Sequence, residues 1–225
     1  MSRNALFHER LYRGDEAMRR VRDSQVTVCG AGALGANITE SLARQGFGKL
    51  RVIDRDRIEE RNLSTQPYFR SDVGAFKAKI LANSLYRALG VEVEAIAEDL
   101  TQTSVDRCLK GSELVLDTFD NSVSRRLVKD SCERLGLACL HVGLAADYAE
   151  VMWNEAYQVP SEANDDVCDY PLARNLIMLA VGVACEVVVN FVIRAEKKSY
   201  TITLADFAVR EFVILSRMIE MDRRI

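Results

Sequence analysis

The chain has 225 residues, of which 48% are hydrophobic and 28% are charged. This balance fits one folded domain, or at most two small ones, and excludes a disordered or fibrous protein. With 30 Lys and Arg against 33 Asp and Glu, the formal net charge is −3. The basic excess that neutralises a nucleic-acid backbone is missing, so nucleic-acid binding is not expected. The charged N-terminal stretch is unlike a signal peptide and predicts a cytoplasmic protein.

The first predicted element is a peripheral helix over residues 5–22, a polar stretch with a few apolar positions. Residues 25–29 are short and β-branched, and they are followed by a glycine-rich turn and a helical run. This order predicts a strand, a turn and a helix. A second strand over residues 49–53 leads into a polar loop that contains Pro67.

A long helix is then predicted from an N-cap at Asp72 to Gly90, because apolar residues recur at helical spacing between them. Strands and helices continue to alternate, with strands over 91–97, 114–118 and 138–142 and helices over 104–109 and 122–135. Alternation of this kind implies right-handed crossovers. The predicted fold class is therefore α/β, a doubly wound, Rossmann-like and mainly parallel sheet with helices on both faces.

The last third of the chain follows a different pattern. A strand near residues 149–153 precedes a polar loop, a long apolar helix over 176–193, and an antiparallel hairpin of residues 200–204 and 207–215. The apolar stretch is about as long as a membrane span, but it contains Glu186 and Asn190. We therefore expect a buried or interface helix and no membrane association.

The six cysteines are scattered along the chain, and the two nearest, Cys132 and Cys139, have six residues between them. Zinc sites made from one stretch of chain need cysteines that lie closer together. No structural zinc is therefore expected. In a cytoplasmic chain most of these thiols are predicted to be buried, and Cys29 and Cys185 fall within a predicted strand and helix.

Gly30, Gly32 and Gly35 form a GxGxxG pattern between a strand and a helix, the context in which such glycines let the backbone approach a phosphate. Asp54 follows Gly35 by nineteen residues and ends the second strand. At that position an acidic side chain can accept hydrogen bonds from both ribose hydroxyls. The pattern predicts an adenosine ribose as ligand, but these features alone do not separate NAD from ATP.

Further along the chain lie charged residues that a hydride transfer does not need. Lys77 lies early in the predicted long helix, and Asp117 and Asp120 lie at the end of the fourth strand. In a doubly wound sheet that strand end faces the same crevice as the glycines. A carboxylate there can hold magnesium and a lysine can pair with a phosphate. These residues favour phosphoryl or adenylyl transfer.

Five linked motifs, in this order and spacing, resemble the ThiF/MoeB/HesA superfamily of ubiquitin-activating-enzyme-like adenylyltransferases. They are residues 30–35, 54–56 (DRD), 62–66 (NLSTQ), Gly74 with Lys77 and Ala78, and 117–121 (DTFDN) with Arg125. The resemblance covers roughly residues 10 to 150. Several motifs in one order are far more specific than a single glycine pattern.

The resemblance implies ATP-dependent adenylation of the C-terminal glycine of a small ubiquitin-like or sulfur-carrier protein, with release of pyrophosphate and with magnesium as cofactor. It further implies a homodimer and one ThiF-type adenylation domain over residues 1–225. That domain would divide into an N-terminal helix (1–24), a nucleotide-binding core (25–145) and a carrier-binding and dimer-contact extension (146–225).

Position by position, the resemblance also implies roles for individual residues. Asp54 would hold the ribose, Asp120 would ligate magnesium, and Lys77 would contact the phosphates. The other implied nucleotide-binding positions are the three glycines, a supporting Asp56, Asn62 and Gln66 in the phosphate loop, and Asn121.

The chain also departs from the family pattern. It has Thr65 where the family has an arginine, so another cation is needed or activity is weak. Arg10 or Arg13 could supply the N-terminal arginine that reaches the nucleotide of the partner subunit. Cys168, in a polar stretch before the apolar helix, is a candidate for thioester or persulfide chemistry, with a structural thiol as the alternative.

Two other functions are kept open at this point. The first is an NAD(P)-dependent oxidoreductase, which would bind its nucleotide without magnesium. The second is a non-catalytic nucleotide-binding scaffold, suggested by the loss of the loop arginine at Thr65. The scaffold would bind ATP but never release pyrophosphate.

Overall fold

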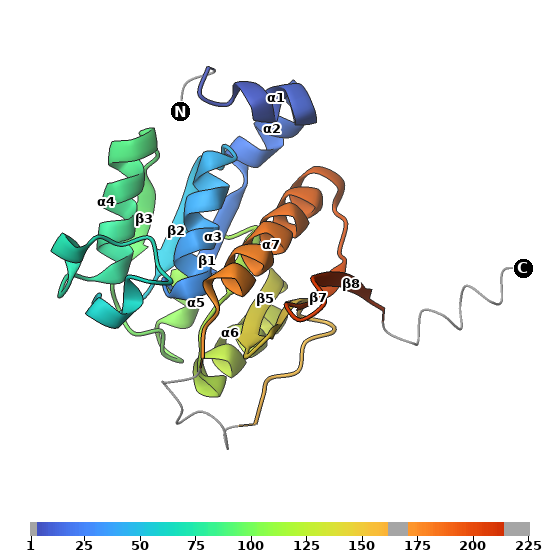
Figure 1. The fold of residues 1–225 in the computed structure, drawn as a ribbon. Coiled ribbons are helices and arrows are strands. Elements are labelled where there is room, and N and C mark those ends of the chain that lie inside the picture. Colours follow the sequence, from blue (N-terminus) through green and yellow to red (C-terminus); the bar gives the residue numbers. More distant parts are fainter. Residues whose placement is uncertain (1–3, 162–170, 214–225) are drawn as a thin grey trace, which may run out of the picture.

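The computed structural model describes residues 4–161 and 171–213 (Figure 1). Its centre is an eight-stranded sheet in the order β3-β2-β1-β4-β5-β6-β7-β8. The strands are β1 (Gln25–Cys29), β2 (Lys49–Ile53), β3 (Val93–Ile96), β4 (Leu114–Asp117), β5 (Ala138–Ala145), β6 (Tyr148–Trp153), β7 (Ser199–Thr203) and β8 (Ala208–Phe212). Pairing is parallel from β3 to β5 and antiparallel from β5 to β8. The predicted fold class is confirmed, including the antiparallel C-terminal part.

Helices cover both faces of the parallel strands. They are α1 (Phe7–Arg13), α2 (Asp15–Asp23), α3 (Ala33–Arg44), α4 (Lys77–Leu89), α5 (Val105–Leu109), α6 (Ser122–Leu135) and α7 (Arg174–Arg194). Side chains alternate along each strand, so Val26 and Val28 join the core under α3, α4 and α7. Cys29 and Val115 face the smaller core under α5 and α6. The five described cysteines are all buried, as expected.

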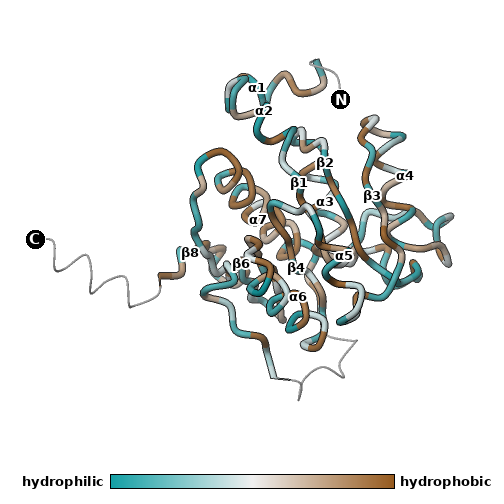
Figure 2. The backbone as a smooth tube through the Cα atoms, turned by 180° about the vertical axis from the view of Figure 1, so that it is seen from behind, coloured by the Kyte–Doolittle hydropathy of each residue, from teal (hydrophilic) through white to brown (hydrophobic). Residues whose placement is uncertain are grey.

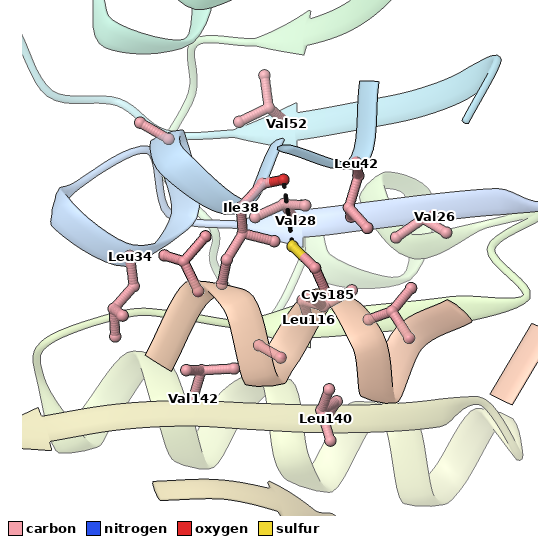
Figure 3. Packing of buried hydrophobic residues seen from close by; sticks show 14 of the residues in the cluster. Val26, Val28, Leu34, Ile38, Leu42, Val52, Leu116, Leu140, Val142 and Cys185 are labelled. Carbon is pink, nitrogen blue, oxygen red and sulfur yellow. Dashed lines mark hydrogen bonds between the residues drawn. The ribbon is translucent and has the colours of Figure 1, made fainter. Parts of the chain in front are cut away.

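Helix α7 packs beside α3 over the sheet, although more than a hundred residues separate them in the chain (Figure 3). Its Cys185 thiol lies 4.0 Å from the carbonyl oxygen of Ile38 on α3. The brown colour along most of its length marks it as hydrophobic (Figure 2). Among the described helices it alone is long and apolar enough to span a membrane, but half of its apolar window is buried in the fold. Burial against α3 and β6 accounts for its apolar sequence.

Two predicted helix boundaries are wrong. The helix expected over residues 5–22 is broken at Gly14, whose φ of 82° ends α1 and starts α2. The long helix begins at Lys77 rather than after Asp72. Asp72 instead ends a short 3₁₀ turn (Arg70–Asp72) and accepts a hydrogen bond from the Phe69 amide. Capping residues serve short turns as well as helices, so an aspartate alone does not fix where a helix starts.

The strand order places a switch point between β1 and β4, where the connections leave in opposite directions. The glycine turn after β1 lies directly beside Thr118, which follows β4 and donates its amide to the carbonyl of Cys29. Helix α3 begins at this carboxyl edge. The chain also returns to this edge just before α7, because Leu172 bridges Ala146 beyond the end of β5. Helix α7 therefore starts near the same edge of the sheet as α3.

Candidate functional site

The three glycines of the turn after β1 have different roles. A Cβ on Gly35 would lie 2.1 Å from the carbonyl oxygen of Gly30, so Gly35 is required for close packing of α3 on the strand. Gly30 has a φ of 102°, and a Cβ there would lie 2.7 Å from Thr118 Oγ1. Gly32, by contrast, has nothing within 4 Å of its Cβ position. Only Gly32 borders open space where a ligand can lie.

Gly32 is also the N-cap of α3, and no side chain caps this helix. The first amide groups of α3 therefore point into the open space beside Gly32 without a side-chain acceptor. Uncapped helix N-termini carry partial positive charge and bind phosphate groups through their amides. This is the arrangement that the glycine pattern predicts.

Asp54 lies directly after β2 and is buried. Its Oδ2 accepts a hydrogen bond of 2.7 Å from the Ala31 amide, and its Oδ1 accepts one of 2.7 Å from the Asp56 amide. Burial raises the pKa of this carboxyl group. Each carboxylate oxygen has a second lone pair that a ribose hydroxyl can use. Asp54 thus holds the glycine turn in place and can still accept bonds from a ribose.

Lys77 is the first residue of α4 and is mostly buried. Its ammonium nitrogen lies 3.2 Å from Asp56 Oδ2, and its amide donates to the Asp56 carbonyl. Tyr68, which the sequence analysis did not single out, donates its hydroxyl to the carbonyl of Ala31 in the glycine turn. It also lies 3.4 Å from the Lys77 carbonyl. These bonds fix Lys77 next to the glycine turn.

The loop of residues 62–66 lies against the first turns of α3. Asn37 of α3 donates its amide group to the carbonyl of Thr65 at 2.9 Å and to that of Ala33 at 2.6 Å. Asn62 accepts the Glu59 amide and closes a 3₁₀ turn (Glu60–Asn62). Within the described chain, the buried Gln66 Oε1 has no hydrogen-bond partner. A buried acceptor without a partner usually indicates a missing donor, such as a water or a ligand.

Asp120 and Asn121 lie in the turn between β4 and α6. Asn121 caps α6 by accepting the Ser124 amide at 2.8 Å. The exposed Asp120 has the Asn121 side chain 3.5 Å away. The described residues contain no cluster of three or more metal-binding side chains. Magnesium commonly binds one or two carboxylates plus phosphate oxygens and water, so Asp120 alone is a sufficient protein ligand.

A buried polar network lies behind this turn. Asp117 accepts from His141 at 2.8 Å and lies 3.7 Å from Arg125, and none of these side chains is much exposed. The other ring nitrogen of His141 lies 2.6 Å from Asn154 Oδ1. Tyr157 stacks on His141 with 3.9 Å between ring centroids and accepts from Arg125. His141 is therefore a core residue whose two ring nitrogens both have partners, and Asp117 is a structural carboxylate.

The remaining predicted residues lie away from the glycine turn. Arg13 is held by Glu186 at 2.7 Å and by Glu9 at 2.8 Å within its own chain. Arg10 pairs with Asp15. Among the described residues, the ion pairs of both arginines are with carboxylates of α1, α2 and α7 and not with the glycine turn. Cys168 lies outside the described residues.

Three residues of this site were missed by the sequence analysis: Asn37, Tyr68 and Arg174. Tyr68 follows the motif of residues 62–66 by two positions, so its closeness to that motif could have identified it as a site residue. Arg174 is 110 residues from Ser64, whose carbonyl it contacts at 3.2 Å. No local pattern links residues so far apart in the chain.

Comparison with known proteins identifies the family. The family model described as "ThiF family" matches residues 2–198. This chain belongs to the ThiF family. A SAMP-activating enzyme E1 of Haloferax volcanii is 37% identical over 131 residues, which cover 57% of this chain and 48% of the relative. A sulfur carrier protein adenylyltransferase of Thermus thermophilus is 37% identical over 126 residues, covering 55% and 46%.

Solved ThiF-like structures share the fold at low sequence identity. E. coli MccB with MccA has a TM-score of 0.81 at 18% identity, covering 95% of this chain and 72% of that one. PaaA has a TM-score of 0.71 at 20% identity, covering 88% and 66%. The chain spans about half the length of the curated ThiF relatives that it matches.

Proposed function

We propose that this protein is an ATP-dependent adenylyltransferase that activates the C-terminal glycine carboxylate of a small ubiquitin-like or sulfur-carrier protein. The observation that carries the proposal is the meeting of an uncapped α3 N-terminus, Asp54 and Lys77 at one switch point. A hydride-transfer enzyme needs the first two but not the lysine. The names of the family relatives, which include sulfur carrier protein and SAMP-activating enzymes, support the same reading.

The residues fit ATP and magnesium. Gly32 leaves space for phosphates at the helix N-terminus. Asp54 can accept the ribose hydroxyls, and Asp120 is an exposed carboxylate that can ligate magnesium. Bound magnesium would neutralise negative charge on the phosphates.

In the proposed reaction a carboxylate oxygen of the carrier attacks the α-phosphorus of ATP. The new bond joins that oxygen to phosphorus, and the bond from the α-phosphorus to the bridging oxygen breaks, so that pyrophosphate leaves with its electron pair. No general base is required, because the carboxylate is ionised at neutral pH. The main barrier is the approach of two anions. Lys77 and the α3 amides lower this barrier by holding the phosphates in position.

We further propose a cytoplasmic homodimer in which α1 contacts the second copy. The apolar side chains of Phe7, Leu11 and Tyr12 are largely exposed on this helix. Exposed apolar groups in one small area are typical of interaction surfaces.

The test is calorimetric titration with ATP plus magnesium, and separately with NADH, on the wild-type protein and Asp120→Ala. We expect magnesium-dependent ATP binding that Asp120→Ala weakens by roughly tenfold, the effect of losing one charged ligand contact. Asp130→Ala is the matched control, because Asp130 is another exposed aspartate close in sequence on α6. It should bind ATP like the wild type.

Activity is then measured as exchange of labelled pyrophosphate into ATP in the presence of a small ubiquitin-like carrier that ends in Gly-Gly. Exchange that depends on the carrier supports the proposal. Tight NADH binding without magnesium would favour an oxidoreductase and contradict it. ATP binding with no exchange for any glycine-tailed carrier would favour a scaffold.

A further inference from the structure

Arg174 lies at the start of α7 and contacts the loop of residues 62–66, which is one of the five motifs that resemble the ThiF family. Its guanidinium donates a hydrogen bond of 3.2 Å to the carbonyl oxygen of Ser64, and the side chain is exposed. The contact joins the C-terminal part of the chain to the nucleotide-binding half. A neutral carbonyl leaves the positive charge of the arginine uncompensated by that contact.

A short path of contacts connects this guanidinium to the glycine turn. Ser64 precedes Thr65, whose carbonyl accepts from Asn37. Asn37 in turn contacts the carbonyl of Ala33, the first residue of α3. These contacts link Arg174 to the first turn of α3, and phosphate groups bind at the N-terminus of this helix in the proposed function.

The loop itself offers little free positive charge toward that space. At position 65 the chain has a threonine, which is buried and uncharged. Two nearby arginines are paired with carboxylates, Arg55 with Asp99 and Arg61 with Glu59. The guanidinium of Arg57 lies over the ring of Phe76, 4.0 Å from the ring centroid. The ammonium group of Lys77 forms an ion pair with the carboxylate of Asp56. Departure of pyrophosphate concentrates negative charge, which calls for a further cation.

We propose that Arg174 is a phosphate-binding residue that contacts the β- and γ-phosphates of ATP and thereby replaces a cation of the 62–66 loop. This inference rests on the proposed function. Because α7 delivers the arginine, formation of the phosphate site depends on the docking of α7 beside α3. A guanidinium suits this role, since its planar donors pair with two phosphate oxygens at once.

The experiment compares the affinities of ATP plus magnesium and of AMP, measured by calorimetry, for wild type, Arg174→Gln and Arg174→Lys. Arg174→Gln should weaken ATP binding about tenfold, the cost of one charged hydrogen-bonding contact. AMP binding should change less than about twofold, because AMP lacks the β- and γ-phosphates. Arg174→Lys keeps the charge but cannot pair with two phosphate oxygens at once, so its ATP affinity should lie between those of wild type and Arg174→Gln.

Arg194→Gln is the matched control, because Arg194 is an exposed arginine at the other end of α7. It should bind both nucleotides like the wild type. Equal ATP affinity in Arg174→Gln and wild type would overturn the inference while leaving the proposed function intact. Equal losses for ATP and AMP would also overturn it. A wild-type protein that binds no ATP would instead refute the proposed function.

Discussion

Residues of the same type differ in what they do in this structure, and the glycine turn shows this clearly. Gly35 is required by packing, since its Cβ would overlap the Gly30 carbonyl, whereas Gly32 faces open space with a φ of −83° that any residue can adopt. The GxGxxG pattern does not separate these roles. Substituting each of the two glycines by alanine separates their roles.

We predict that Gly35→Ala destabilises the fold by about 3 kcal/mol or more, because backbone atoms of the strand must move to admit a methyl group. Gly32→Ala should unfold at the wild-type urea concentration but bind ATP more weakly, since its methyl group enters the phosphate space. Urea unfolding and calorimetry measure the two effects. A stable Gly35→Ala, or full ATP affinity in Gly32→Ala, would contradict this division of roles.

Glu150 and Glu155 give a matched pair for pH dependence. Burial raises the pKa of Glu150, despite the nearby Arg125. Burial also works against the charged form of Glu155, but its hydrogen bond to Lys197 lowers its pKa overall. Glu150 has a pKa of about 4.3 in the unfolded chain. Its contribution to the free energy of unfolding is therefore fully present below that pH and is lost as the pH rises through its higher pKa in the folded protein. Stability linked to Glu155 is lost as pH falls.

We predict that Glu150→Gln gains stability over wild type between pH 4 and pH 7.5, because the variant has no partly buried carboxyl group to ionise at this position. Glu155→Gln should lose stability over the same range, since it removes a favourable ion pair. Urea unfolding at several pH values gives both differences. If the free energy of unfolding changes with pH in the same way for wild type and Glu150→Gln, the raised pKa of Glu150 is refuted.

At the scale of elements, α7 connects the N-terminal helices to the nucleotide-binding core. Its Glu186 binds Arg13 of α1 through both carboxylate oxygens, at 2.7 and 3.2 Å. This partly buried pair, whose arginine has a raised pKa because of the Glu186 bond, explains why an apolar helix keeps a glutamate. The same helix brings Arg174 to the loop at its other end.

We predict that Glu186→Gln accelerates hydrogen exchange in α1 and α2 and lowers stability by about 1–3 kcal/mol, the usual cost of weakening a partly buried charged contact. Glu40→Gln is the control, since the Glu40–Arg44 pair lies on the surface of α3, where such pairs contribute less than about 1 kcal/mol. Unchanged exchange in α1 would show that the pair does not hold the helix.

For the whole molecule, the open question is association. Leu11 and Tyr12 on α1 are 70% and 81% exposed. We predict that sedimentation detects a dimer and that Leu11→Glu converts it to a monomer, because a charge in an apolar interface loses its hydration. Phe207→Glu, at an equally exposed phenylalanine in the turn between β7 and β8, should leave the dimer intact. A wild-type monomer at all concentrations would contradict this prediction.

The amino-acid sequence by itself determined the α/β fold and the family, because strand and helix periods and the order of five motifs are local properties. Helix α6 was predicted with its observed bounds (Ser122–Leu135), since Asn121 caps it and Gly136 ends it. Gly30 and Asp54 were placed correctly at the ends of neighbouring strands for the same reason. Local turn chemistry was less reliable, as the start of α4 at Lys77 shows.

Only the tertiary structure decided which distant residues meet. Tyr68 bonds the glycine turn, Glu186 holds Arg13, and Arg174 reaches Ser64 across 110 residues. The contacts of Glu186 and Arg174 depend on how α7 packs against α2 and α3, which follows from burial of apolar surface rather than from any sequence spacing. Hydrophobic packing is non-directional, so it fixes long-range neighbours only when the whole core is assembled.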